Sequence, residues 1–62
     1  MDDDRWEVGA RWELYGRPMT LERTSYFQAT PWAHFAGLVQ AVEMGEMTPA
    51  NGWRFIGKEG ER

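Results

Sequence analysis

A serine, a histidine and several acids are the side chains of this chain that could perform covalent catalysis. Ser25, His34 and one of the N-terminal aspartates have the residue types of a nucleophile, its base and an orienting acid. Such a triad is defined by geometry, and no spacing in the sequence brings these three groups together. The pattern favours a strand serine, a surface histidine and a solvated tail, so we expect no enzyme activity.

Two groups of carboxylates could serve acid–base chemistry or hold a metal ion. Glu43 and Glu46 are three residues apart, but they flank Gly45, where we expect a helix to end. The acids at 2–4 are consecutive and lack the alternating spacing and the glycine of a calcium loop. Both groups are therefore expected to be solvated, and we predict no metal site.

A third pattern partly matches a phosphate-binding loop. Gly52, Gly57 and Lys58 have the spacing of that loop. Glu59 then stands where a Ser or Thr should bind magnesium, and the residues between the two glycines are bulky and strand-like. We do not expect phosphate binding here.

The composition limits the fold and the class of protein. The chain has 62 residues, enough for one small domain, and it contains no cysteine and one histidine. Disulfides, thiolate metal sites and a histidine-held zinc site are thereby excluded. No segment is apolar over a membrane-spanning length, and the acidic start is not that of a secretory signal. We expect one cytoplasmic (intracellular) domain over residues 1–62, with mobile ends at 1–4 and 58–62 and without a cofactor.

Two strands joined by a tight turn are expected in the first half of the chain. From 6 to 14, apolar residues recur at every second position with charged residues between them, which is typical of a half-buried strand. Gly and Pro within 15–18 indicate a hairpin turn. A second strand follows over 19–27, although Arg23 and Ser25 fall on the side on which its first apolar residues lie.

The strongest helix pattern follows residue 30. Thr30 is a good N-cap, and Pro31 is favoured at the first helical position. Apolar residues then recur at helical spacing, and Gly45 suits the position just past a helix end. We expect a helix over 31–44 and, after a loop, a short final strand over 53–56.

The sequence thus predicts an α+β fold, a small three-stranded antiparallel sheet packed by one α-helix in the order strand, strand, helix, strand. Two layers around one core are the minimum stable arrangement. The predicted core places Trp6, Trp12, Leu14, Met19, Leu21, Trp53 and Phe55 of the sheet against Trp32, Phe35, Leu38, Val39 and Val42 of the helix. The alternative is a small SH3-like β-barrel, which requires extended chain over 35–47.

The outer face of the expected helix carries no charge, which makes it a candidate contact surface. No Asp, Glu, Lys or Arg occurs from Thr24 to Val42. A helix exposed to water normally keeps charge on its outer face, so we expect a partner to cover this one. The net charge of −3 adds attraction to basic surfaces. The predicted protein-binding residues are Asp2, Asp3, Asp4, Glu7, His34, Gly37, Gln40, Ala41, Glu43, Met44 and Glu46.

We therefore predict a non-enzymatic acidic protein-binding domain, an inhibitor or adaptor that docks on the basic surface of a nucleic-acid-handling or defence complex. In size, acidity and lack of catalytic groups, the chain is similar to the small inhibitors that phages and other mobile elements direct at host enzymes. That similarity covers no motif. A homodimer through the helix is also open, because Ala33, Gly37 and Ala41 form a stripe of small residues.

Two other functions stay open. A sheet that binds single-stranded nucleic acid would use arginines and aromatic residues, here Arg5, Arg11, Tyr15, Arg17, Arg23 and Tyr26. Glutamates alternate with these arginines and the chain is acidic, so direct nucleic-acid binding ranks second. The other alternative is a structural subunit of an oligomer.

Overall fold

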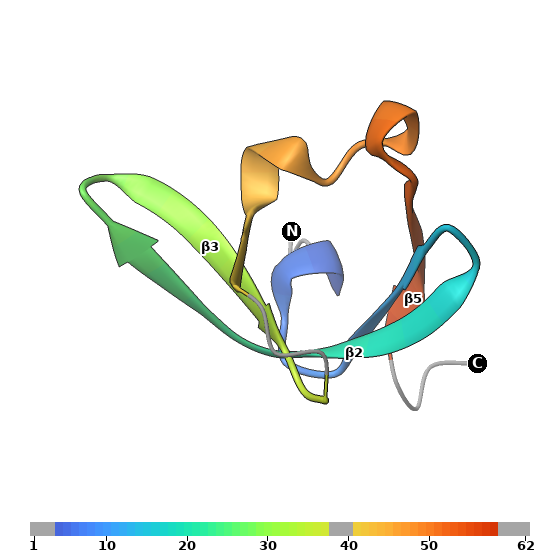
Figure 1. Cartoon of the computed structure of the whole chain (residues 1–62). Coiled ribbons are helices and arrows are strands. Elements are labelled where there is room, and N and C mark those ends of the chain that lie inside the picture. Colours follow the sequence, from blue (N-terminus) through green and yellow to red (C-terminus); the bar gives the residue numbers. More distant parts are fainter. Residues whose placement is uncertain (1–3, 38–40, 59–62) are drawn as a thin grey trace.

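The chain forms one five-stranded antiparallel β-sheet with the strand order β4-β3-β2-β1-β5 (Figure 1). The computed structural model describes residues 4–37 and 41–58. The strands are β1 (Ala10–Leu14), β2 (Arg17–Phe27), β3 (Thr30–Phe35), β4 (Ala41–Glu43) and β5 (Trp53–Lys58). Three 3-10 helices complete the described chain: η1 (Asp4–Trp6), η2 (Met44–Glu46) and η3 (Pro49–Asn51).

The prediction of a three-stranded sheet packed by a helix over 31–44 is wrong. This region contains β3, β4 and η2, and no helix in the described residues is longer than three residues. Pairing with distant strands overrides the local helix preference, because β3 has a partner on each side, β2 and β4. Pro31 is tolerated because β4 pairs only with 32–34, so the proline lies beyond the end of that ladder.

The alternative fold, a small SH3-like β-barrel, agrees in part with what is observed, because the chain forms a five-stranded antiparallel sheet whose first four strands are a meander, in which β2 pairs with both β1 and β3. It required extended chain over 35–47, of which only Ala41–Glu43 is a described strand, and Met44–Glu46 is a 3-10 turn. Among the described strands, β4 and β5 are the two edges of the sheet and do not pair with each other.

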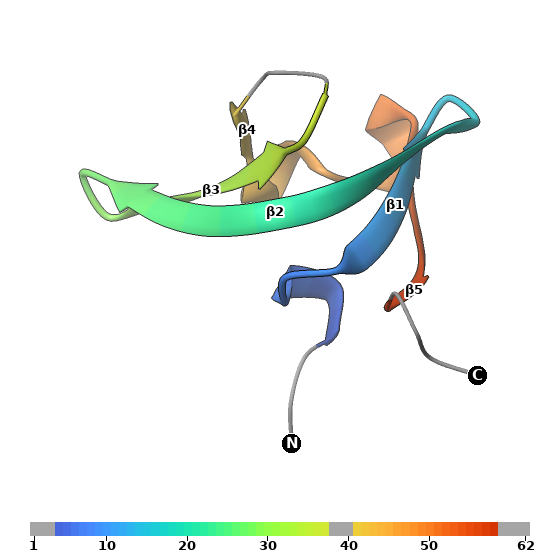
Figure 2. The ribbon, with the colours of Figure 1, turned by 90° about the horizontal axis from the view of Figure 1, so that it is seen from below.

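Strand β2 joins the two halves of the sheet. Figure 2 shows it as one curved ribbon between two turns, with β1 along its first part and β3 along its second. The expected first hairpin is confirmed, with its strand starting at Ala10. The register shifts between Leu21 and Arg23, which marks a β-bulge. The bulge turns Arg23 and Ser25 to the face opposite Leu21, and it accounts for the broken alternation in the sequence.

The core lies on the concave face, inside the bend of the sheet. Its buried residues are Ala10, Trp12, Met19, Leu21, Ala33, Phe35, Met47 and Trp53, and Trp6, Leu14, Val42, Met44 and Phe55 pack partly buried against them. Most of the predicted core is confirmed, but Ala33 and Met47 were not expected in it, and Met44, predicted on the outer contact face, packs against it instead. Trp32 is not part of this cluster, and Leu38 and Val39 lie outside the described residues.

Trp12 is the centre of the aromatic part of the core. Its ring stacks on Trp6 at 5.2 Å between centroids, meets Trp53 edge-on at 6.1 Å and lies 5.3 Å from Phe55. The Trp12 indole N–H donates a 3.0 Å hydrogen bond to the Arg5 carbonyl oxygen. One side chain thereby joins η1, β1 and β5.

Candidate interaction surface

The residues predicted to form one helical contact face do not share a face. Because no helix forms there, they are distributed over several elements: His34 in β3, Gly37 in the turn after it, Ala41 and Glu43 in β4, and Met44 and Glu46 in η2. Ala33 of the proposed small-residue stripe is fully buried in the core. The helix-mediated homodimer is therefore wrong, and Gln40, Asp2 and Asp3 lie outside the described residues.

The net negative charge comes from residues outside the described structure, and Asp2 and Asp3 of the predicted set are among them. The described residues contain six carboxylates and six Lys or Arg side chains, so the excess of −3 belongs to residues 1–3 and 59–62. Two ion pairs balance part of the described charge: Glu13 with Arg54 at 3.3 Å, and Glu7 with Lys58. An attraction of the sheet itself to a basic partner consequently has little electrostatic support.

The uncharged run in the sequence forms the second hairpin of the sheet. Thr24 to Phe27 close β2, and Thr30 to Phe35 form β3. Tyr26 and Phe27 are 74% and 64% exposed. In β3, alternate residues face opposite sides of the sheet, and Ala33 is on the core side. Tyr26 pairs with Pro31 on that same side, whereas Phe27 pairs with Thr30 on the outer side.

The turn of this hairpin holds two ordinary residues in a left-handed conformation. Gln28 has φ 51° and Ala29 has φ 68°. A two-residue turn with both φ values positive matches the twist of the strands, but it normally uses Asn and Gly. Each such residue costs about 1–2 kcal/mol. We use "hairpin tip" for Tyr26, Phe27, Gln28 and Ala29.

Ser25 and His34 meet on the outer face of the same hairpin. The Ser25 Oγ lies 2.7 Å from the His34 Nε2, the contact that the sequence alone did not place. Asp4, the only described N-terminal aspartate, is in η1, and no salt bridge links a described carboxylate to His34. Within the described residues the pair has no acid to complete a triad, and it is explained as a hydrogen bond that joins β2 to β3.

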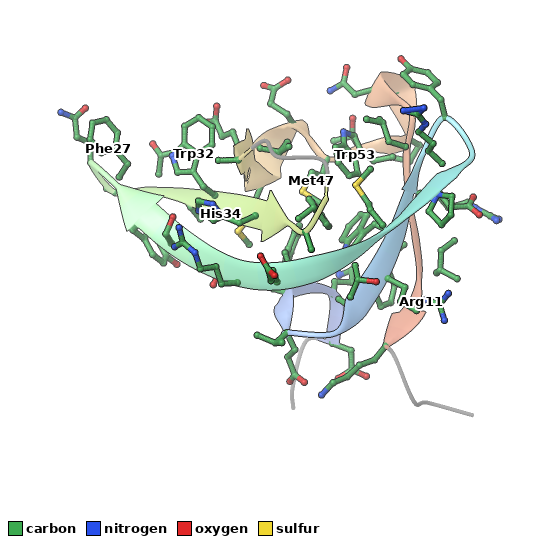
Figure 3. All side chains as sticks on the ribbon, turned by 60° about the horizontal axis from the view of Figure 1, so that its bottom comes forward. Arg11, Phe27, Trp32, His34, Met47 and Trp53 are labelled. Atoms are coloured by element: carbon green, nitrogen blue, oxygen red, sulfur yellow. The ribbon has the colours of Figure 1, made fainter. Side chains whose placement is uncertain are left out.

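Trp32 lies beside this pair and outside the core. It is opposite Ser25 on one side and Glu43 on the other. Its indole Nε1 is buried and has no hydrogen-bond partner among the described residues. Figure 3 places Trp32, His34 and Phe27 along the same hairpin, away from Met47 and Trp53.

The residues of the nucleic-acid alternative are spread along β1 and β2. Tyr15 and Arg17 lie at the first turn of the sheet, whereas Tyr26 lies at the far end of β2. Arg11 and Arg23 are exposed on the strands between. Arg5 lies at 5.8 Å over the Trp6 ring, which already occupies its guanidinium. These groups do not form one cluster of arginines and stacking platforms.

A cavity of about 530 Å³ opens at the other end of the sheet from the hairpin tip. Its walls are Trp12, Trp53 and Phe55, with Met47, Pro49, Gly16 and Gly52, and charged groups of Arg5, Glu13 and Arg54 line it as well. The volume is within the range of about 300–1,000 Å³ that is usual for ligand sites. We use "aromatic cavity" for this site, which sequence reasoning missed because its residues are far apart in the chain.

The remaining sequence motifs do not form sites in the described structure. Gly52 follows η3, and Gly57 and Lys58 end β5, so the partial phosphate-loop spacing lies along a strand. The described part of the chain contains no group of three His, Asp or Glu side chains placed to hold a metal ion. None of its helices has the length and apolar character needed to cross a membrane.

Comparison of the chain with protein-family models, with curated proteins and with solved structures finds no match.

Proposed function

We propose that the chain is a non-enzymatic protein-binding domain whose contact surface is the β2–β3 hairpin. The observation that carries this proposal is the end of this hairpin, residues 24–35, which is paired, contains no Asp, Glu, Lys or Arg, and has two exposed aromatic side chains. Exposed strands in soluble proteins usually carry charges that prevent association. Their absence over this hairpin favours a surface that is covered by another protein in the functional state.

The two aromatic residues give the hairpin the chemistry of a binding hot spot. Burial of Tyr26 and Phe27 removes about 150–250 Å² each from water, and tyrosine is enriched among such residues. The hairpin is already ordered by its pairing and by the Ser25–His34 contact, so binding loses little conformational entropy. No Asp, Glu, Lys or Arg side chain within residues 24–35 has to be desolvated.

If the domain is an acidic inhibitor, its net negative charge is supplied by residues near the two ends of the chain. Asp2 and Asp3 could add attraction to a basic partner, but the sheet itself is balanced in charge. In our proposal the hairpin supplies the affinity, and the acidic segments accelerate association.

The proposal is tested by site-specific photo-crosslinking in the cells that produce the protein. A photoreactive phenylalanine analogue is placed at Phe27 in one variant and at Ile56, which is 46% exposed on β5, in a matched control. We expect discrete covalent protein adducts from position 27 and none of equal yield from position 56. Equal yields from both positions, or none from position 27, would refute the proposed contact surface.

A further inference from the structure

Asn51 and Gly52 are adjacent residues that can react with each other without an enzyme. We propose that Asn51 is a site of spontaneous deamidation, which the folded turn η3 suppresses and which loosens one wall of the aromatic cavity once it has occurred. Asn51 is the only asparagine of the chain, and Gly52 follows it directly. The neighbouring Trp53 and the hairpin residue Phe27 lie at opposite sides of the sheet (Figure 3), so this inference does not depend on the proposed function.

The reaction needs only these two residues and water. The backbone nitrogen of Gly52 attacks the side-chain carbonyl carbon of Asn51, so that an N–Cγ bond forms and the Cγ–Nδ2 bond breaks. The proton of the attacking nitrogen passes through water to the leaving amide, which departs as ammonia. One water molecule then opens the succinimide ring at either carbonyl carbon and gives aspartate or isoaspartate. Glycine permits the attack because it has no Cβ that would hinder the approach of its nitrogen.

The folded turn holds both reacting groups in hydrogen bonds. The Gly52 N–H donates to the Pro49 carbonyl oxygen at 3.0 Å. The Asn51 side-chain amide donates to the Glu46 carbonyl oxygen at 2.9 Å. The first bond retains the proton that must leave, and the second fixes the orientation of the amide. The folded chain therefore reacts only when this turn opens.

Opening of η3 does not require the whole sheet to unfold. Asn51 is exposed to solvent, and η3 contains no buried residue. The backbone bonds that close the turn are few: the amides of Asn51 and Trp53 both donate to the Thr48 carbonyl oxygen, at 2.9 and 3.0 Å. Exposed turns of this kind open at a lower free energy than core strands. The rate of modification then follows the fraction of molecules in which the turn is open.

The product cannot make the hydrogen bond that the asparagine makes. A carboxylate has no N–H to donate, and it would face the Glu46 carbonyl oxygen and lie close to the Glu46 carboxylate, whose Oε1 is 3.5 Å from the amide nitrogen. The lost bond joins η3 to η2 across the buried Met47. Its loss frees the segment that contributes Pro49 and Gly52 to the aromatic cavity.

The rate of the reaction is measured in the folded and in the unfolded chain. Both samples are kept at mildly alkaline pH, one in buffer and one in guanidinium chloride, and peptide mass spectrometry follows the exchange of NH for oxygen at Asn51. We expect the unfolded chain to react at least about tenfold faster. The matched control is Gly52→Ala in guanidinium chloride, where folding has no influence; its methyl group should slow the reaction several-fold.

The effect of the modification is measured on variants. Asn51→Asp contains one of the two products, and Asn51→Ala is the matched control that only removes the donor. We expect both to unfold at lower urea concentration than the unmodified chain, and Asn51→Asp to unfold at the lowest, because its charge faces the oxygens of Glu46.

Three results would overturn the inference. Equal rates in the folded and unfolded chain would show that η3 does not protect Asn51. The absence of conversion in guanidinium chloride would show that Asn51 is not a reactive site. An unfolding midpoint of Asn51→Asp equal to that of the unmodified chain would show that the product does not loosen the turn. None of these results affects the crosslinking test at Phe27.

Discussion

Replacement of Gly52 by alanine tests the turn that positions β5 and one wall of the aromatic cavity. Gly52 follows η3 with φ 89°, and its carbonyl oxygen accepts a 2.8 Å hydrogen bond from the Tyr15 amide. A Cβ at this position would lie 2.5 Å from the Tyr15 Cζ. The substitution Gly52→Ala therefore strains the backbone and also displaces the tyrosine ring.

The structure allows the two effects to be ranked. The left-handed conformation costs an L-residue about 1–2 kcal/mol, and the lower entropy of the unfolded alanine chain offsets about 0.4–1 kcal/mol of that. The contacting atoms belong to the far end of a ring that is 80% exposed, so Tyr15 can rotate into solvent. We expect the backbone effect to dominate, with a net loss of about 1 kcal/mol in the free energy of unfolding.

Two other glycines provide matched controls. Gly16 has φ 83° and open space around its Cβ position, so Gly16→Ala tests the backbone effect alone. Gly45 also has open space, without a positive φ, so Gly45→Ala should cause no comparable loss. Urea and thermal unfolding monitored by tryptophan fluorescence measure the series, with a fall in Tm of about 4–8 °C per kcal/mol.

The expected order of stability is Gly45→Ala first, then Gly16→Ala, with Gly52→Ala equal to the second or slightly lower. The difference between the last two should vanish in a Tyr15→Ala background, because the clash is then absent. One common unfolding midpoint for all three variants would refute the backbone effect at the positive-φ glycines. A Gly52→Ala variant that is much less stable than Gly16→Ala, and stays so without the tyrosine, would refute the ranking of the two effects.

Three further changes test the core, the outer face and the hairpin turn. Trp12→Ala should destabilise by about 3–5 kcal/mol, most or all of the stability of so small a domain, and should abolish the dispersed amide spectrum; a folded spectrum would disprove its central role. Ser25→Ala should reduce the free energy of unfolding by about 0.5–1.5 kcal/mol, and the loss should disappear in a His34→Ala background if the hydrogen bond is its cause. Ala29→Gly should increase the unfolding free energy by up to about 1 kcal/mol because it relieves a positive φ, whereas the control Ala50→Gly should decrease it; equal effects of the two glycines would show that the turn is unstrained.

Local alternation was sufficient to predict the first hairpin and the last strand. The pattern before Leu14 has apolar and charged residues on opposite sides, and β1 has this arrangement. Tyr15 and Gly16 form the expected turn, with both φ values positive. These elements form between residues that are close in the sequence, or from a short run of residues. The sequence pattern therefore indicates directly which side chains face the core and which face solvent.

The helix prediction failed because β3 has apolar residues on both faces. Ala33 and Phe35 point to the core, while Trp32 lies on the outer face beside Ser25. Because apolar residues lie on both faces of β3, the alternation typical of a strand is lost. The apolar spacing that remains in the sequence resembles that of a helix. Met47 was missed for a related reason, since a buried residue between two 3-10 turns has no periodic pattern.

The uncharged run was correctly recognised in the sequence, but it was assigned to the wrong element. Tyr26 was proposed only for nucleic acid, and Phe27 was not proposed at all. Their position next to a two-residue turn within an uncharged run was the available signal. This signal points to a surface only once the structure shows that β2 continues beyond the core.

The amino-acid sequence alone determined which residues are charged, which strands alternate and that aromatic side chains must supply the core. The tertiary structure decided the rest: the pairing of β1 with β5, the place of β3 between two strands, and therefore the hairpin tip and the aromatic cavity. The physical reason is that strand pairing joins residues such as Leu14 and Trp53 across a long stretch of chain. The free energy of that pairing depends on the whole sheet, so it cannot be predicted from the spacing of residues within a short segment.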